Sequence, residues 1–227
     1  MGAGLAVVCG LALRGMPLGD RWVNASYDYL FLFGARAPKH RVALILMDNE
    51  SYERCGQTRD EPWSRGLHAQ LLNRLADDKC RLVVFDSFFE KARDPASDQA
   101  LAEAMRRHES VVLMARLRDS SLQDVGPTVQ NEESAGPRLP AEQFLKAANN
   151  NYGVALVNQD PDLTARRQWP FPAPGPVWLR SLPWTAALVA GAQLSSEPQE
   201  QWLRYYGEHG AWDSVPSSCM TAAPTTW

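Results

Sequence analysis

The chain has 227 residues, and its 23 basic and 26 acidic residues give a formal net charge of -3 at pH 7. This balance excludes the strongly basic surface of a nucleic-acid-binding domain, while the 45% of hydrophobic residues suffices for the core of one sizeable domain. The four cysteines form no C-x-x-C pair, so their spacing predicts no zinc site. A disulfide between Cys55 and Cys80 stays open, because pairing depends on the compartment.

The N-terminal segment, residues 1–13, is uncharged and largely apolar. A bilayer span takes about 20 such residues, and a signal peptide begins with positive charge, which is absent here before Arg14. Composition therefore leaves two interpretations open: a buried helix, or the outer end of a transmembrane helix.

Short apolar runs alternate with amphipathic segments along most of the chain. We expect strands over residues 42–48, 82–86, 111–117, 153–158 and 202–206, and helices over 22–33, from 64, from 97, over 141–148 and over 182–194. Continuous apolar strands between amphipathic helices are typical of strands buried on both faces of a parallel sheet. The sequence predicts an α/β fold of three layers, with a mostly parallel central sheet and helices on both faces.

The helix that begins near Ser64 has the clearest amphipathic pattern. Ser64 is a suitable N-cap residue. After it, Leu67, Leu71, Leu72 and Leu75 fall on one face. We expect Leu71 and Leu75 to be buried against the sheet.

Two acidic residues, Asp48 and Asp86, follow the first two predicted strands directly. The carboxyl ends of strands in open α/β sheets are where ligands bind, and paired carboxylates there can hold a divalent cation or act as nucleophile and general acid or base. The alternative is that each carboxylate caps a following helix or turn through backbone N–H groups. The chain has no G-x-S-x-G, P-loop, G-x-G-x-x-G or H-E-x-x-H motif that would indicate an enzyme class.

Trp63 and Arg65 form a second candidate cluster at the start of a predicted helix. An aromatic ring beside a guanidinium can hold an anion or a ring-bearing ligand. The structural alternative is that Trp63 fills the seam between helix and sheet while Arg65 pairs with an acid such as Asp86.

Asp160, Asp162 and Arg166 form a third candidate cluster. An Asp-x-Asp sequence can bind calcium, but the glycine-spaced loop and later Glu of an EF-hand are missing. A hydrogen-bonded turn is the favoured interpretation.

A series of short motifs in this chain resembles the type-2 CHASE domain, and the resemblance covers about residues 20–227. In chain order the motifs are Ser26-Tyr-Asp28, Leu46-Met-Asp48-x-Glu50-Ser51, Pro62-Trp63-x-Arg65-x-x-His68, Val83-Val-Phe-Asp86-x-x-Phe89, Asp98-x-x-Leu101-Ala102, Asn158-x-x-x-Asp162-x-x-x-Arg166, Ser181-Leu182 and Tyr205-Tyr-Gly207. Each motif is weak alone, and their order makes the resemblance specific.

The resemblance implies an extracytoplasmic sensory domain of a bacterial membrane protein, on the periplasmic side of the inner membrane. In that family the domain follows one transmembrane helix and precedes three more, with a cytoplasmic adenylate cyclase, Ser/Thr kinase or histidine kinase beyond. Residues 1–19 would then be the end of the first membrane helix. Residues 20–227 would be the sensory domain without its closing strand.

The chain departs from the family pattern at two places. The usual Trp-Pro-Trp-x-Arg is here Glu61-Pro62-Trp63-Ser64-Arg65, and the usual Asp-Gly turn is Asp162-Leu163. Leucine does not readily adopt a positive φ, so this turn must either differ in shape or carry strain.

We therefore expect a sensory, ligand-binding domain of a membrane signalling receptor that is not itself an enzyme. The expected partners are an unidentified small-molecule or protein signal and the membrane, through flanking helices; a homodimer is compatible, and nucleic acid, metal and cofactor are not expected. A metal-dependent hydrolase or phosphatase using Asp48 and Asp86, and a structural dimerisation module, stay as alternatives. The predicted ligand-binding residues are Asp48, Trp63, Arg65, Asp86, Asp162 and Arg166.

Overall fold

The computed structural model describes residues 4, 7, 10, 17–34, 42–117, 137–157, 159–168, 170, 179–194, 199–206 and 213–216. The chain divides into two compact units, Met1–Leu44 with Trp202–Ser214, and Ile45–Gln201 with Val215–Trp227. The domain boundary predicted after residue 19 stays a prediction.

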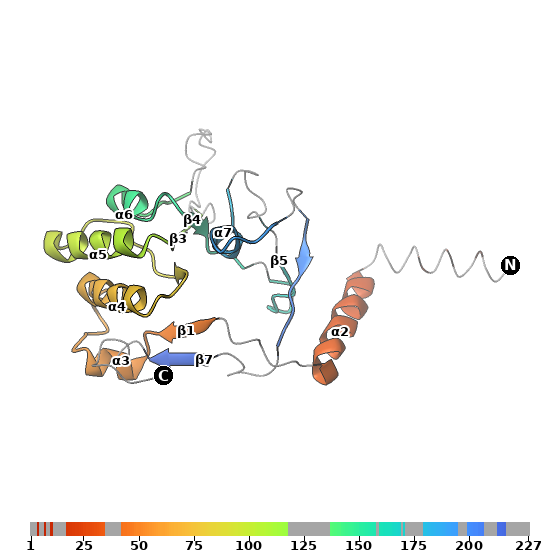
Figure 1. The fold of residues 1–227 in the computed structure, drawn as a ribbon. Helices are drawn as coiled ribbons and strands as arrows, with labels where there is room; N and C mark the ends of the chain where they lie inside the picture. The colour runs from red at the N-terminus through yellow and green to blue at the C-terminus, as the bar shows by residue number, and fades with distance from the viewer. Residues whose placement is uncertain are drawn as a thin grey trace, which may run out of the picture. The chain divides into compact units, whose positions relative to one another are not determined.

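A three-stranded parallel sheet forms the centre of the larger unit (Figure 1). Its strands are β2 (Val83–Phe85), β3 (Val111–Ala115) and β4 (Tyr152–Val154), in that spatial order. Val83 of β2 lies opposite Val111, and Leu113 of β3 lies opposite Tyr152. All five residues of β3 are buried, as expected for the middle strand of a parallel sheet covered on both faces.

Helices cover both faces of this sheet. Alternate residues of a strand point to opposite faces, and here Val111 and Leu113 belong to one hydrophobic cluster while Val112 and Met114 belong to another. The first cluster draws on α4 (Arg65–Asp77), α5 (Pro95–His108) and α6 (Glu142–Ala147), and the second on α7 (Leu182–Val189). The predicted α/β fold with a parallel central sheet between helices is confirmed, although this sheet is small.

Of the two long helices of the larger unit, α4 begins where its sequence predicts, whereas α5 begins at Pro95, two residues before the predicted start at residue 97. Ser64 occupies the N-cap position of α4, although its side chain makes no capping hydrogen bond. Asp94 caps α5 by accepting a hydrogen bond from the Ser97 N–H at 2.9 Å. On α4, Leu71 is buried as predicted, but Leu75 is only half-buried, and Leu72 is the leucine with no exposed surface.

The first predicted strand does not join the central sheet. It forms β1 (Ala43–Leu46), which pairs with β7 (Asp213–Pro216) in a separate two-stranded sheet. Leu44 and Leu46 are 44% and 45% exposed, so the prediction of a strand buried on both faces is wrong here. An apolar run shows that a segment favours a strand, but pairing with a distant segment decides which sheet it joins.

Shorter elements complete the described part of the chain. Helix α3 (Asn49–Arg54) follows β1, and β5 (Arg167–Gln168) pairs with β6 (Gln201–Trp202). Of the strand predicted over residues 202–206, only Trp202 lies in a strand of the structure.

In the smaller unit, α2 (Pro17–Gly34) is the helix predicted over 22–33. Its buried Tyr27 packs against Trp202 at 4.6 Å between ring centroids, and Phe31 lies 5.9 Å from Tyr205. Of the predicted membrane-helix end, only positions 4, 7 and 10 are described before α2, and these are helical. Among the described residues, no helix has both the length and the apolar character required to cross a bilayer.

Candidate functional site

Asp48 caps a helix. It precedes α3, and its carboxylate accepts a hydrogen bond from the Ser51 N–H at 2.9 Å. The hydrogen bonds from Ser51 lower the pKa of Asp48 below its ordinary value, because they stabilise the ionised form. This arrangement matches the capping alternative.

Asp86 follows β2 and is exposed to solvent. Because β1 and β2 belong to different sheets, Asp48 and Asp86 do not follow neighbouring strands of one sheet in the described structure. No group of three or more His, Cys, Asp and Glu side chains among the described residues could hold a metal ion. Ligand binding by these two acids stays a prediction.

Arg65 is almost completely buried, with 2% of its side chain exposed, and it pairs with Asp98. Its other terminal nitrogen donates to the Lys91 carbonyl oxygen. The guanidinium also lies over the Phe144 ring, 4.8 Å from its centroid. The alternative that Arg65 pairs with an acid is thus confirmed, but the acid is Asp98 and not Asp86. Arg65 begins α4 and Asp98 lies in the first turn of α5, and these helices pack together.

The Asp98 carboxylate, which is itself buried, is the centre of a polar network. Besides Arg65, it accepts hydrogen bonds from the Arg93 N–H at 2.8 Å and from the Gln143 amide at 3.2 Å. Burial alone would raise the pKa of Asp98, but the hydrogen bonds from Arg65 and Arg93 outweigh it and lower the pKa. The network ties α4, α5, α6 and the segment 91–93 together, which is the role of a structural lock.

Trp63 and His68 fill the space beside this lock. Trp63 is buried and meets the Tyr52 ring of α3 edge-to-face at 4.8 Å. His68 contacts the rings of Phe85 and Phe89 edge-to-face, with centroid distances of 5.6 and 5.4 Å. Burial, with repulsion from Arg93 and Arg65, lowers the pKa of His68 to about 4, so the ring is neutral at pH 7. Trp63 is therefore buried, as the structural alternative expected, but its ring partner belongs to helix α3, and a position in the seam between helix and sheet stays a prediction.

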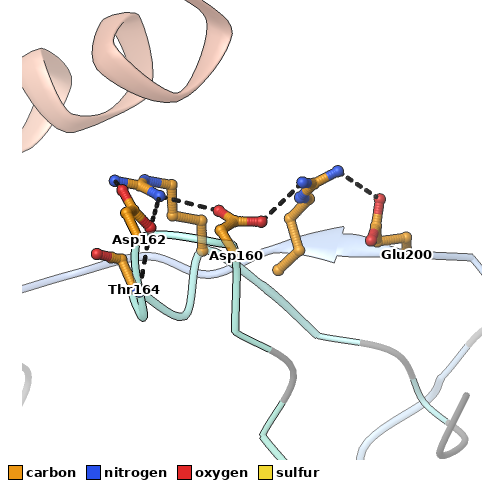
Figure 2. Close-up of polar contacts among 6 residues, drawn as sticks. Asp160, Asp162, Thr164 and Glu200 are labelled. Atoms are coloured by element: carbon orange, nitrogen blue, oxygen red, sulfur yellow. Dashed lines mark hydrogen bonds and ion pairs between the residues drawn. The ribbon is translucent and has the colours of Figure 1, made fainter. Parts of the chain in front are cut away.

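The third predicted cluster is brought together in full (Figure 2). The Arg166 side chain is 4% exposed, and its Nη1 donates to Asp160 at 2.9 Å and to Asp162 at 2.9 Å. Its Nη2 donates to the second oxygen of Asp162 at 2.7 Å. Asp162 thus holds the guanidinium with both carboxylate oxygens, which is the strong bidentate geometry.

Two further charged residues extend this cluster. Arg167 donates to the other oxygen of Asp160 at 2.8 Å and to Glu200 at 3.4 Å (Figure 2). The hydrogen bond from Arg166 lowers the pKa of Asp162 to about 2. We name the five residues Asp160, Asp162, Arg166, Arg167 and Glu200 the charge cluster.

The turn that carries Asp162 is strained. The Leu163 N–H donates to the Asp160 carbonyl at 2.8 Å, and the Asp160 N–H donates to the Thr164 carbonyl at 2.9 Å. A tight turn closed in this way commonly places a glycine in the left-handed region at its end, but here Leu163 occupies that region with φ of 63°. Of the two outcomes expected at Asp162-Leu163, the structure has the strained turn.

The structure therefore brings Asp162 and Arg166 together, but Asp48 and Asp86 do not follow neighbouring strands of one sheet. Arg93 connects Trp63 with the Arg65–Asp98 pair, because its guanidinium donates to the Trp63 carbonyl at 3.4 Å and its backbone N–H donates to Asp98. Sequence reasoning missed the parts played by Asp98, Arg167 and Glu200. Only Arg167 carried a local signal, its adjacency to Arg166. The cysteines Cys55 and Cys80 are not joined in a disulfide.

Comparison with known proteins identifies a family for this chain. The family model of the CHASE2 domain matches residues 3–222. CHASE2 domains are extracellular sensory domains of signalling proteins and are not catalytic. No curated protein and no solved structure matches the sequence.

Proposed function

Because this chain belongs to the CHASE2 domain family, we propose that it is the extracytoplasmic sensory domain of a bacterial membrane signalling receptor. The observation that carries the proposal is the family match, which spans residues 3–222 and so includes both compact units. The signal is a small molecule or a protein, and the effector is a cyclase or kinase domain elsewhere in the receptor.

The proposed location is the periplasmic side of the inner membrane, with the domain held there by flanking membrane helices. The uncharged apolar run over residues 1–13 supports this arrangement, since it has the composition of the end of a membrane helix. The helical positions Gly4, Val7 and Gly10 are in keeping with it.

The proposed mechanism is a shift between two conformations of the domain. A ligand can shift such an equilibrium only through its different affinities for the two states. The larger unit supplies a packed three-layer body in which the Arg65–Asp98 lock holds α4, α5 and α6 together. The charge cluster lies outside that lock, beside a strained turn, and it is therefore the better candidate for the part that changes.

The test is a pair of reporter insertions at Asp60 in the complete receptor. Asp60 lies in an exposed turn, where insertions are tolerated. We expect an enzyme that is active only in the periplasm to be active there, and a fluorescent protein that folds only in the cytoplasm to be dark. The reverse pattern would overturn the proposal, and normal membrane insertion of both fusions is the control.

A second measurement addresses signalling. Deletion of residues 45–201 should leave the effector domain folded but abolish its response to the cell's signal. An unchanged response would show that this domain does not sense it.

A further inference from the structure

We propose that the Arg166 guanidinium is a carboxylate-binding site that the Asp162 side chain occupies in the ligand-free protein, and that a carboxylate group of the signal molecule displaces Asp162. The inference rests on the sensory function proposed above and names the chemical class of the ligand.

The two acids that hold Arg166 differ in their surroundings. Asp160 contacts both Arg166 and Arg167, and its side chain is 10% exposed, so it is fixed at the base of the cluster. Asp162 is 52% exposed and comes from the turn (Figure 2). Movement of Asp162 would therefore uncover a buried guanidinium while Asp160 stays in place.

The geometry selects a planar ligand group with two oxygens. Asp162 accepts from Nη1 at 2.9 Å and from Nη2 at 2.7 Å, which is the two-point contact that arginine makes with carboxylates. A free carboxylate has the same shape and can reproduce both hydrogen bonds. The Asp162 side chain is thus an internal copy of the group that would replace it.

The charges select an anion with a single negative charge. Among its own five residues the charge cluster has two arginines and three acids, so removal of Asp162 from Arg166 leaves two positive and two negative groups within these residues. A monocarboxylate group restores the original balance. A phosphate or sulfate would bring more negative charge close to Asp160 and Glu200 and is disfavoured.

The strained turn makes displacement easier than it would be from a relaxed one. Leu163 has a left-handed backbone, so opening the turn lets this residue return to an ordinary conformation. Arg166 directly precedes β5 (Arg167–Gln168), so a change at the turn acts on the first residue of that strand. Binding at Arg166 would then alter a paired strand, as a sensory response requires.

The experiment measures the thermal stability of the full chain in increasing sodium acetate, with sodium chloride added to keep the ionic strength constant. Asp162→Ala removes the two-oxygen partner of Arg166, and we expect acetate or formate to raise the melting temperature of this variant in a saturable way. The acetate midpoint for Asp162→Ala should lie at least about tenfold below that of the unchanged protein, where Asp162 competes for the site. Sodium sulfate at the same ionic strength should not raise the melting temperature of Asp162→Ala in this saturable way.

Two variants serve as matched controls. Asp162→Asn keeps a side chain of the same size but offers one acceptor oxygen in place of two, so its acetate midpoint should lie between those of Asp162→Ala and the unchanged protein. Glu200→Ala removes a carboxylate from the same cluster but leaves Arg166 paired with Asp162, so its acetate midpoint should stay at that of the unchanged protein.

The outcomes are decisive even if Asp162→Ala does not fold in chloride. Recovery of folded protein by refolding in acetate, and not in sulfate, would support the site. An absence of any acetate effect, or an equal effect on the Glu200→Ala control, would overturn it. The reporter insertions at Asp60 do not depend on acetate, so a failed carboxylate site would leave the proposed sensory function standing.

Discussion

Arg65 and Arg166 are buried to a similar degree, with 2% and 4% of their side chains exposed, but they are held differently. Asp98, the partner of Arg65, is also buried, whereas Asp162, one partner of Arg166, is half-exposed. A buried charge is tolerated only when it is paired and hydrogen-bonded. The first pair therefore behaves as part of the core, and the second pair can be reached from solvent.

The first prediction tests the lock at Arg65. We expect Arg65→Met to lower the free energy of unfolding by about 3–5 kcal/mol, because it leaves the Asp98 carboxylate buried without its partner. Urea denaturation of the full chain measures this change. Arg107→Met is the control: Arg107 pairs with Asp77 at 2.5 Å, but both side chains are more than half exposed, so the loss should be below about 1 kcal/mol. Equal losses in the two variants would contradict the lock.

The second prediction concerns the strained turn. Leu163 is 76% exposed and has a positive φ, so its side chain gains little from packing while its backbone is strained. We expect Leu163→Gly to raise the free energy of unfolding by about 0.5–1 kcal/mol, since relief of the strain exceeds the entropy that glycine adds to the unfolded chain. Leu163→Ala keeps a Cβ and should show no gain. A destabilised glycine variant in urea denaturation would show that the turn is not strained.

At the scale of elements, β4 and α7 approach each other closely at one glycine. A Cβ built on Gly153 would lie 2.5 Å from the Leu182 Cα and 2.6 Å from the Ser181 carbonyl oxygen. The backbones meet here because Val154 and Ser181 form a parallel bridge, with the Val154 N–H donating to the Arg180 carbonyl at 2.9 Å. A glycine inside a strand often marks such an approach.

The third prediction follows from this contact. Gly153→Ala should lower the free energy of unfolding by about 1–3 kcal/mol or more, because backbone atoms must move to admit the methyl group. Gly66→Ala is the matched control: the nearest atom to its Cβ is the Ser64 Oγ at 3.5 Å, and alanine favours a helix, so α4 should be unchanged or more stable. Thermal melts of both variants measure the contrast, and similar effects in both would contradict the close approach.

Most elements of the larger unit could be predicted from local patterns. The apolar runs at β2 and β3 and the leucine spacing in α4 are local signals, because burial on a sheet or along one helix face repeats at a fixed interval. The position of β1 could not be predicted in this way. Its pairing with β7 joins segments that are distant in the sequence, and hydrophobic pattern alone does not select a partner.

The same distinction separates the parts of the candidate site. Asp162 and Arg166 are four residues apart in one turn, so their cluster could be foreseen. Arg65 and Asp98 are 33 residues apart and meet only because α4 and α5 pack together. Glu200 reaches Arg167 from 33 residues away, beside the paired strands β5 and β6. Contacts that depend on tertiary packing leave no signal in local spacing.

At the scale of the whole molecule, the stability of the fold should depend on pH through buried histidine. His68 is 5% exposed, and its pKa is lowered to about 4 by burial and by nearby Arg93 and Arg65. Burial also lowers the pKa of His108, so protonation of this residue likewise favours the unfolded chain as the pH falls. The pKa values of Asp98 and Asp160 are lowered too, because hydrogen bonds from arginines outweigh the effect of burial. The stabilisation that these two ionised aspartates contribute is lost as the pH falls.

The fourth prediction is the sign and window of this dependence. Above about pH 6.5, His68 is neutral in both the folded and unfolded chain and contributes no slope. As the pH falls from about 6.5 to about 4, the unfolded chain binds a proton that the folded protein does not, so its stability decreases by up to about 1.4 kcal/mol per pH unit. The aspartates add their losses as the pH falls below about 4, the ordinary value for an aspartate, at which the unfolded chain begins to take up their protons.

The measurement is urea denaturation of the unchanged protein and of His68→Gln at intervals from pH 7 to pH 4. The variant loses the packing of His68 against Phe85 and Phe89, so it should be less stable at pH 7. Its free energy of unfolding should nevertheless fall less steeply between about pH 6.5 and pH 4, by about 2–3 kcal/mol over that window, because glutamine does not titrate. Parallel curves for the two proteins would show that another group carries the dependence, and an ordinary pKa for the His68 ring by NMR titration would refute its cause.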